Sequence, residues 1–576
     1  MRKLLLDKIK FFKVILTQDI VLLVVSALFS LRWLPGRYND LFFYTFSVLS
    51  IVLTLVFIIK RIKRRPYFQL GRQRTIIYVF LIFSIMITIL SGVLYFPDNK
   101  NFILYLSYLL IFTAFILISP IERKMFFETV TLLIAVTIIQ YIIFLLINKG
   151  YYSVYGLALN KSTLANVLVI YFFIFLHSIK KLNTLSFIYA AIIVLIILLT
   201  GARTAIVGLL ISSILVFSFR YNKKELVVFF FIFGSILGLI IYGLYLWRPD
   251  SVKGRLLLWK SFLSSSRSIQ DLFFGKGVGY SEYKAQMFLK LYMQNSNTPE
   301  QLLAGSTFST MNEYLKIFVD SGLIGVILFV ALLYITSYYF IIRKKVFLLA
   351  ANISFMSVSM FSYPLYFPFI WIMMLFLWTY PGDVRSKIIS CKALYFKIGS
   401  ALMICIFLFV AYRISIYSFY LIKWNGVQNN SNYLYDEPGF QKSYNILNKQ
   451  LNNNPYFLSD YAQKLQSLSR FERSKKILER AVEIEPTAER LMMLGYNCEM
   501  THLYDSAEYY YKRAIQTQPK LFRPRYLLFN LYVKLDKRNL AKDAATRILL
   551  FPVKVPSEDV EKIKDVAKKY LSDPYN

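Results

Sequence analysis

Long apolar runs separated by short polar segments occupy most of residues 1–424. A helix that crosses a membrane needs about 20 predominantly apolar residues, and the pattern predicts about 12–13 such helices. The expected helices start near Val14, Leu41, Ile76, Phe102, Phe126, Thr163, Leu185, Arg203, Glu225, Ser321, Val346, Leu365 and Gly399. The sequence therefore predicts an all-α fold whose first part is a polytopic membrane helix bundle.

Lys and Arg alternate between successive short loops, which predicts the orientation of the bundle. If the N-terminus is cytoplasmic, the basic loops near residues 60–65, 220–224 and 343–345 all lie on the cytoplasmic side. The long polar loop at about 248–320 then lies on the outer side. With thirteen spans, the C-terminal part of the chain is extracytoplasmic as well.

Composition supports a membrane protein. Hydrophobic residues make up 57% of the chain and charged residues only 17%, whereas a soluble protein carries about 25% charged residues. The formal charge of +35 does not indicate nucleic acid, because many basic residues fall in short loops. Cys391, Cys405 and Cys498 lack metal or disulfide spacing, and His177 and His502 are too few for a metal site. We therefore expect no metal, no cofactor and no nucleic-acid partner.

A second domain is predicted from about Asn429 onward, where the composition changes to that of a soluble helical protein. Pro486, Pro519 and Pro552 are spaced 33 residues apart, and such a period is typical of a helical repeat. Leu494-Gly495 and the small residues nearby fit the tetratricopeptide pattern. We therefore expect an α-solenoid over 430–576, following a membrane domain over 1–424.

Two interpretations of this solenoid stay open from the sequence. Stacked helix pairs give a concave surface that can bind a protein partner. The alternative is a folded cap that has no partner.

Two arginines are candidate phosphate ligands on the outer side. Arg203 opens a predicted span after a minimal loop, in the motif TGARTA. A charge at this position is costly unless it reaches the interface or serves a function, so an interfacial anchor is the alternative. Arg255 begins RLLLWKSFL, which has the spacing of an amphipathic surface helix. Arg suits phosphate oxygens, and we group Trp259 and Lys260 with it as substrate-binding residues. Attraction of the basic face to anionic lipid is the alternative.

Two further motifs complete the candidate site. Gly275, Gly277 and Gly279 form a G-x-G-x-G run without the ending of a nucleotide-binding loop. We expect a tight turn whose backbone N–H groups help to hold an anion. Asn312 is a substrate-binding candidate, and Glu313 is the best-placed general base if its surroundings raise its basicity. A solvated surface carboxylate is the alternative for Glu313. Other carboxylates that stay open are Asp320, Asp250, Glu282 and Glu300.

The order of these motifs resembles the O-antigen ligase and polymerase superfamily over about residues 15–380. The motifs are TGARTA, R-x-x-x-W, FGxGxGxxxY and NEYLKIFVDSGLIGVILF. The resemblance implies an inverting, metal-independent glycosyltransferase of membrane C-type architecture in the bacterial inner membrane. It implies a donor glycan on undecaprenyl pyrophosphate, bound by Arg203 and Arg255. A tetratricopeptide tail also occurs on some members.

The chain departs from that family at one position. Ligases of the family usually have His-Asn in the last motif, and this chain has Met311-Asn312. The expected reaction is glycan transfer to an acceptor hydroxyl of lipid A-core, another glycan or a protein. An O-antigen ligase, a repeat-unit polymerase and a protein O-oligosaccharyltransferase therefore stay open. A lipid-linked glycan flippase is the alternative from another class, and it would place charges mid-span and broken helices in paired halves.

Overall fold

The computed structural model describes residues 69–71, parts of 127–142, 161–179, 183–219, 249–264, 268–277, 279–293, 303, 309–378, 388–390, parts of 412–428, 437–553 and 556–573. The predicted spans near Val14, Leu41, Ile76, Phe102, Glu225 and Gly399 lie outside these residues. The chain divides into two compact units. Unit 1 comprises residues 1–247, 273–278 and 311–419, and unit 2 comprises residues 248–272, 279–310 and 420–576.

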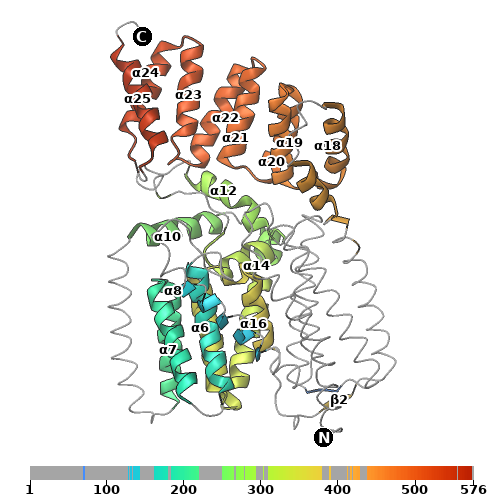
Figure 1. Cartoon of the computed structure of the whole chain (residues 1–576), viewed down its shortest axis with the longest axis vertical. Coiled ribbons are helices and arrows are strands. Elements are labelled where there is room, and N and C mark those ends of the chain that lie inside the picture. Colours follow the sequence, from blue (N-terminus) through green and yellow to red (C-terminus); the bar gives the residue numbers. More distant parts are fainter. Residues whose placement is uncertain are drawn as a thin grey trace. The chain divides into compact units, whose positions relative to one another are not determined.

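The described part of the chain is helical apart from one short pair of strands, which confirms the all-α prediction (Figure 1). Strands β1 (Gln69–Gly71) and β2 (Ile388–Ser390) pair antiparallel, with Leu70 opposite Ile389. Each strand has three residues, so the pair adds one short link within unit 1 and does not change the fold class.

The helices of unit 1 begin close to the residues that the apolar pattern predicts. They are α6 (Lys161–Ser178), α7 (Thr184–Leu199), α8 (Arg203–Ser218), α14 (Glu313–Ile342), α15 (Val346–Phe361), the 3₁₀ turn η3 (Pro364–Tyr366) and α16 (Pro368–Trp378). Among the described residues, α6 and α14 are long and apolar enough to cross a membrane. The number of spans and their orientation stay predictions.

Helix α14 starts eight residues before the predicted span at Ser321 and is interrupted at Gly322. Gly322 has φ 68° and ψ −170°, a backbone conformation that favours glycine and ends regular helix geometry. The predicted span corresponds to the part of α14 after this break. The residues before it form a separate helical segment, which carries Asn312 and Glu313 at its start.

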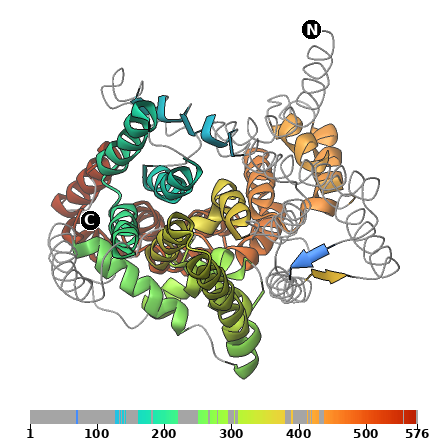
Figure 2. The ribbon, with the colours of Figure 1, turned by 90° about the horizontal axis from the view of Figure 1, so that it is seen from below.

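Helices α6, α8 and α15 pack closely in unit 1, and Figures 1 and 2 show α6 and α8 side by side. A Cβ atom at Gly208 would lie 3.4 Å from Val358 and 3.5 Å from the Ser354 carbonyl, so the glycine lets α8 approach α15. At the same contact, the Ser354 hydroxyl donates a hydrogen bond to Ser212 Oγ at 2.7 Å. Small residues therefore set the spacing of the two helices, and a polar pair links them.

Unit 2 contains helices from two distant parts of the sequence. The loop contributes α10 (Pro249–Leu263), α11 (Ile269–Phe274, whose last two residues belong to unit 1) and α12 (Tyr280–Met293). The C-terminal part contributes α18 (Glu437–Leu451), α19 (Pro455–Ser467), α20 (Phe471–Ile484), α21 (Ala488–Met500), α22 (Tyr504–Thr517), α23 (Arg523–Lys534), α24 (Arg538–Leu550) and α25 (Glu558–Ser572). In the C-terminal part, each helix packs against the helix that follows it in sequence (Figure 1).

The C-terminal helices follow the predicted period. Helices α20 and α22 begin at Phe471 and Tyr504, 33 residues apart, and α24 follows at Arg538, 34 residues later. A Cβ atom at Gly495 would lie 2.6 Å from the Tyr511 ring, so this small residue allows α21 to pack against α22. These contacts are those expected of paired repeat helices. Assignment to the tetratricopeptide family stays a prediction.

Asp460 on α19 fixes the start of the C-terminal helices. Its carboxylate accepts hydrogen bonds from Trp424 Nε1 at 2.8 Å, Gln428 Nε2 at 3.1 Å and the Tyr444 hydroxyl at 2.7 Å. Three donors from the preceding helical segments thus converge on one carboxylate. The C-terminal helices are therefore tied to the segment that connects them to the rest of the chain.

Candidate active site

The start of α14 is built by Asn312, which caps the helix. Its Oδ1 accepts the backbone N–H of Leu315 at 3.0 Å, and its Nδ2 donates to the Met360 carbonyl at 2.9 Å. Capping by Asn satisfies an N–H group that has no partner within the helix. Met311 precedes it with φ 54°. The side chain predicted to bind substrate therefore also joins α14 to the end of α15.

Glu313 is completely buried at the first position of α14, with 0% of its surface exposed. Its Oε1 accepts the backbone N–H of Leu365 in η3 at 2.8 Å. The alternative of a solvated surface carboxylate is therefore wrong for Glu313, and its role as a base stays a prediction. Hydrogen bonds from both Asn312 and Glu313 reach residues 360–365, the connection between α15 and α16, which sequence reasoning did not select.

The same connection is linked to the start of α8, where Arg203 lies. Thr204 donates from its hydroxyl to Asn166 Oδ1 at 3.4 Å, and Asn166 Nδ2 donates to Ser362 Oγ at 3.2 Å. Arg203 is the first residue of α8 and is half-buried. The structure thus brings the TGARTA motif and the Asn312-Glu313 motif to one end of the unit 1 helices, around residues 360–365.

Two more charged side chains are buried on the first part of α14. Lys316 is 5% exposed and Asp320 is 3% exposed. Lys316 and Asp320 follow Glu313 by three and seven residues, a spacing that places all three side chains on one face of the helix. Buried charges need compensating partners, so this face of α14 is polar although it is buried. Lys316 was missed from the sequence, although its spacing from Glu313 carried the signal.

The glycine turn packs directly on the break in α14. Gly275 has φ 73°, and a Cβ atom there would lie closer than 3.0 Å to the backbone of Asp320. A Cβ atom at Gly322 would lie equally close to the Phe273 carbonyl. The two glycines therefore allow a backbone-to-backbone contact that no larger residue permits.

Hydrogen bonds complete this contact. The backbone N–H of Lys276 donates to Val319 O at 2.9 Å, and that of Gly277 donates to Asp320 O at 3.0 Å. The sequence predicted that N–H groups of this turn hold an anion. These two N–H groups are instead occupied by α14, so the observed role of the turn is to fix the break in that helix.

Arg255 lies in unit 2 on α10, which confirms that the predicted helix forms; its place on the outer membrane surface stays a prediction. Arg255 is half-buried and Lys260 is exposed. Trp259 Nε1 donates to the Thr310 carbonyl at 3.1 Å, and Phe262 is fully buried. Trp259 therefore holds α10 to the end of the loop, two residues before Asn312 in sequence.

The remaining loop candidates also belong to unit 2. Gly279 has φ 81° and its carbonyl accepts the N–H of Glu282 at 3.1 Å in the first turn of α12. Asp250 is exposed in the first turn of α10, and Glu300 lies outside the described residues. Arg255 and Arg203 belong to different units, so their joint action on one substrate stays a prediction.

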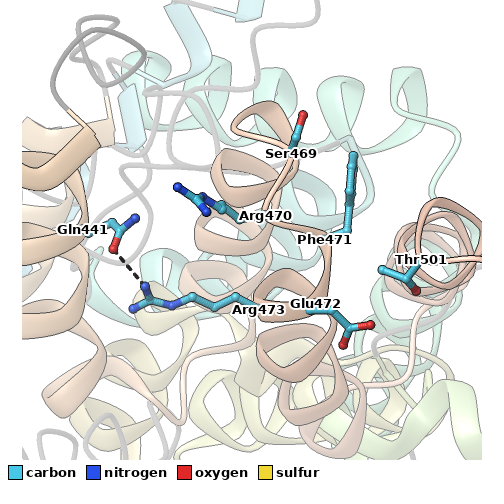
Figure 3. Close-up of a pocket in the computed structure, with 7 residues that line it drawn as sticks. All are labelled: Gln441, Ser469, Arg470, Phe471, Glu472, Arg473 and Thr501. Carbon is cyan, nitrogen blue, oxygen red and sulfur yellow. Dashed lines mark hydrogen bonds between the residues drawn. The ribbon is translucent and has the colours of Figure 1, made fainter.

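A separate pocket of about 560 Å³ lies among the C-terminal helices (Figure 3). Arg473 donates to Gln441 Oε1 at 3.1 Å, and Arg470 donates to Glu437 Oε1 at 3.0 Å. Both guanidinium groups thus tie α20 to α18, and none of the predicted transfer residues lines the pocket. Among the described residues, no group of three or more His, Cys, Asp and Glu side chains is placed to hold a metal ion.

Comparison with known proteins identifies one related region. No curated protein matches the chain. Residues 188–330 match the family model described as O-Antigen ligase, and this segment contains all four motifs described above. That family is integral to the membrane. The match is narrower than the range of 15–380 expected from the motifs, and it supports a place for this chain in the O-antigen ligase and polymerase superfamily.

Proposed function

We propose that this protein transfers a glycan from undecaprenyl pyrophosphate to an acceptor hydroxyl at the outer face of the bacterial inner membrane. The observation that carries the proposal is the match of residues 188–330 to the O-Antigen ligase family. The acceptor is lipid A-core, another glycan or a protein hydroxyl. The arrangement of unit 1 supports it, because two of the motifs meet at residues 360–365.

The reaction needs a leaving group, a nucleophile and a base. The acceptor oxygen attacks the anomeric carbon from the face opposite the pyrophosphate, and the carbon–oxygen bond to the pyrophosphate breaks. Arg203 and Arg255 neutralise the negative charge that grows on the departing undecaprenyl pyrophosphate. Fixed cations aimed at developing charge are among the largest contributions to enzymatic rates. Attack from the opposite face inverts the configuration at the anomeric carbon.

Glu313 takes the proton from the acceptor hydroxyl in this scheme. Its burial removes competing water, and its hydrogen bond to Leu365 holds one carboxylate oxygen in place. A base fixed in this way is oriented before the acceptor arrives. Asp320 is the second buried carboxylate on the same helix and is the alternative base.

A repeat-unit polymerase is the second candidate. It is favoured by Met311, which stands where ligases of the family usually have His. Both reactions use the same donor and the same leaving group, so Arg203 and Arg255 keep their roles. The two candidates differ only in the acceptor.

A strain that lacks the gene tests the proposal. Its lipopolysaccharide would be separated on a gel, and its lipid-linked glycan would be quantified in parallel. Loss of all O-chain together with accumulation of glycan on undecaprenyl pyrophosphate indicates a ligase, and a core with single repeat units indicates a polymerase. An unchanged gel with accumulated carrier-linked glycan points to another polysaccharide or a glycoprotein acceptor. No change in any lipid-linked glycan contradicts the proposal.

A further inference from the structure

Helix α12 of the loop packs against the C-terminal helices, through residues as far apart in sequence as Lys284 and Glu483, which are separated by 199 positions. It contacts α22 directly (Figure 1). In addition, Lys284 Nζ on α12 donates a hydrogen bond to the backbone carbonyl of Glu483 on α20. Both contacts lie within unit 2. The C-terminal helices therefore bind a segment of the same chain.

The position of Glu483 explains why a lysine is suitable here. Glu483 lies in the last turn of α20, which ends at Ile484. Carbonyls of the last turn lack partners within the helix and carry partial negative charge, so a cation at this end is stabilising. Burial lowers the pKa of Lys284, while the nearby Glu483 and Glu485 carboxylates raise it and Arg480 lowers it. Lys284 thus serves as an anchoring cation at the end of α20.

Helix α12 also packs against α10. The rings of Phe288 and Phe262 meet edge to face with centroids 5.2 Å apart, and Leu289 packs with Leu257. Ala285, Phe288 and Leu289 are all buried. A helix of 14 residues is marginal alone in water, so α12 depends on these contacts for its stability. Helix α12 therefore contacts both the C-terminal helices and the helix that carries Arg255.

We infer that the C-terminal helices act as a positioning element for the loop, and that Lys284 is the positioning residue that couples them through α12 to α10. The inference rests on the proposed function for its catalytic meaning, since Arg255 would bind the donor pyrophosphate. It does not need an external protein partner on the C-terminal helices. It assigns this part of the chain a role within the transferase itself.

This role predicts a particular kinetic pattern. If the anchor is lost, the ordered loop becomes a minor population, and the apparent donor affinity falls in proportion to that population. Loss of one hydrogen bond from a charged group changes such a population by about tenfold. We expect KM for the lipid-linked donor to rise roughly tenfold. The value of kcat should change little, because saturating donor restores the ordered loop.

Hydrogen–deuterium exchange on the full-length protein in detergent tests the anchor without requiring activity. Lys284→Glu should raise amide exchange in α12 and α10, and Lys284→Arg should keep it near wild type. Lys476→Glu is the matched control, because Lys476 is an exposed lysine on α20. Helix α21 serves as the internal reference for the fold of the C-terminal helices. If Lys284→Glu also raised exchange in α21, the fold of the C-terminal helices would be disturbed. The milder Lys284→Ala variant would then be used to test whether exchange rises in α12 and α10 alone.

Three outcomes decide the inference. Unchanged exchange in α12 and α10 for both Lys284→Glu and Lys284→Ala overturns it. A fall in kcat with unchanged KM, measured with undecaprenyl-pyrophosphate-linked glycan, also overturns it, because Lys284 would then act in the chemical step. Faster exchange in α12 and α10 in a protein whose wild type shows no transfer supports the anchor and places the failure on the proposed function.

Discussion

Replacement of Glu313 by Gln separates the two roles that its position allows. The side chain is fully buried, and its Oε1 accepts the Leu365 N–H at 2.8 Å. Gln has nearly the same size and its amide oxygen can accept the same hydrogen bond. An amide cannot act as a general base. Glu313→Gln therefore keeps the structural contact and removes the proposed chemistry.

The expected magnitudes of the two roles differ. Loss of a general base lowers a rate by about 10²–10⁴-fold, so Glu313→Gln should lower kcat by that factor. Glu313→Ala also leaves the buried Leu365 N–H without this acceptor, which costs about 1–3 kcal/mol. The alanine variant should therefore lose both activity and thermal stability, and the glutamine variant should lose mainly activity.

Purified variants would be assayed for consumption of lipid-linked glycan and for their thermal midpoint. Asp320→Asn provides the comparison, because Asp320 is the other buried carboxylate on α14. If Glu313→Gln kept more than half of the wild-type rate, Glu313 would have only a structural role. A rate loss confined to Asp320→Asn would move the base to that residue.

Three further substitutions, with one control, test contacts that the structure shows directly. Gly275→Ala and Gly322→Ala each place a Cβ atom closer than 3.0 Å to opposing backbone, so both should lower the thermal midpoint and the transfer rate. Gly254→Ala is the control and should change neither, because no atom lies within 4 Å of its Cβ position. An unchanged thermal midpoint in the first two variants would refute the backbone contact. Asn497→Leu removes a fully buried amide that accepts from Gln466 at 2.7 Å and donates to Ser474 at 2.8 Å. It should cost about 1–3 kcal/mol, because the buried Ser474 hydroxyl and the half-buried Gln466 amide each lose one hydrogen-bond partner. Its effect is measured as faster amide exchange across α19–α22, and exchange equal to wild type would contradict it.

Much of the helical framework could be predicted from the sequence because it depends on local patterns. Apolar runs located α6, α7, α8 and α15 within a few residues. The 33-residue period located α20 and α22, and α24 starts one residue later than an exact repeat would place it. These features need only the spacing of side chains along one segment.

The arrangement of the candidate site depends on contacts between distant segments, which periodicity does not encode. Asn312 and Glu313 were identified from their motif, but their bonds to Met360 and Leu365 span 48 and 52 residues. The role of Gly275 depends on its contact with the helix break at Gly322, which lies 47 residues later in sequence. The motifs identified these residues in the sequence, and the structure shows which of them are in contact.

The docking surface predicted on the C-terminal helices illustrates the same limit. The repeat pattern indicated a surface able to bind a partner, and an external protein was the natural expectation. The structure places α12 of the same chain against α22, and Lys284 against the end of α20. That contact joins segments about 200 residues apart, so no local pattern could have indicated it. An additional external partner stays a prediction.

The central claim is that this protein consumes a pyrophosphate-linked glycan with Arg255 at the leaving group. The most direct test measures release of undecaprenyl pyrophosphate by purified wild type, Arg255→Ala and Arg255→Lys, with Lys253→Ala as an exposed control on the same helix. We expect release by wild type and the control, a loss of about 10²–10³-fold in Arg255→Ala, and partial activity in Arg255→Lys. Equal release by Arg255→Ala, or movement of intact lipid-linked glycan across a bilayer without release, would contradict the account.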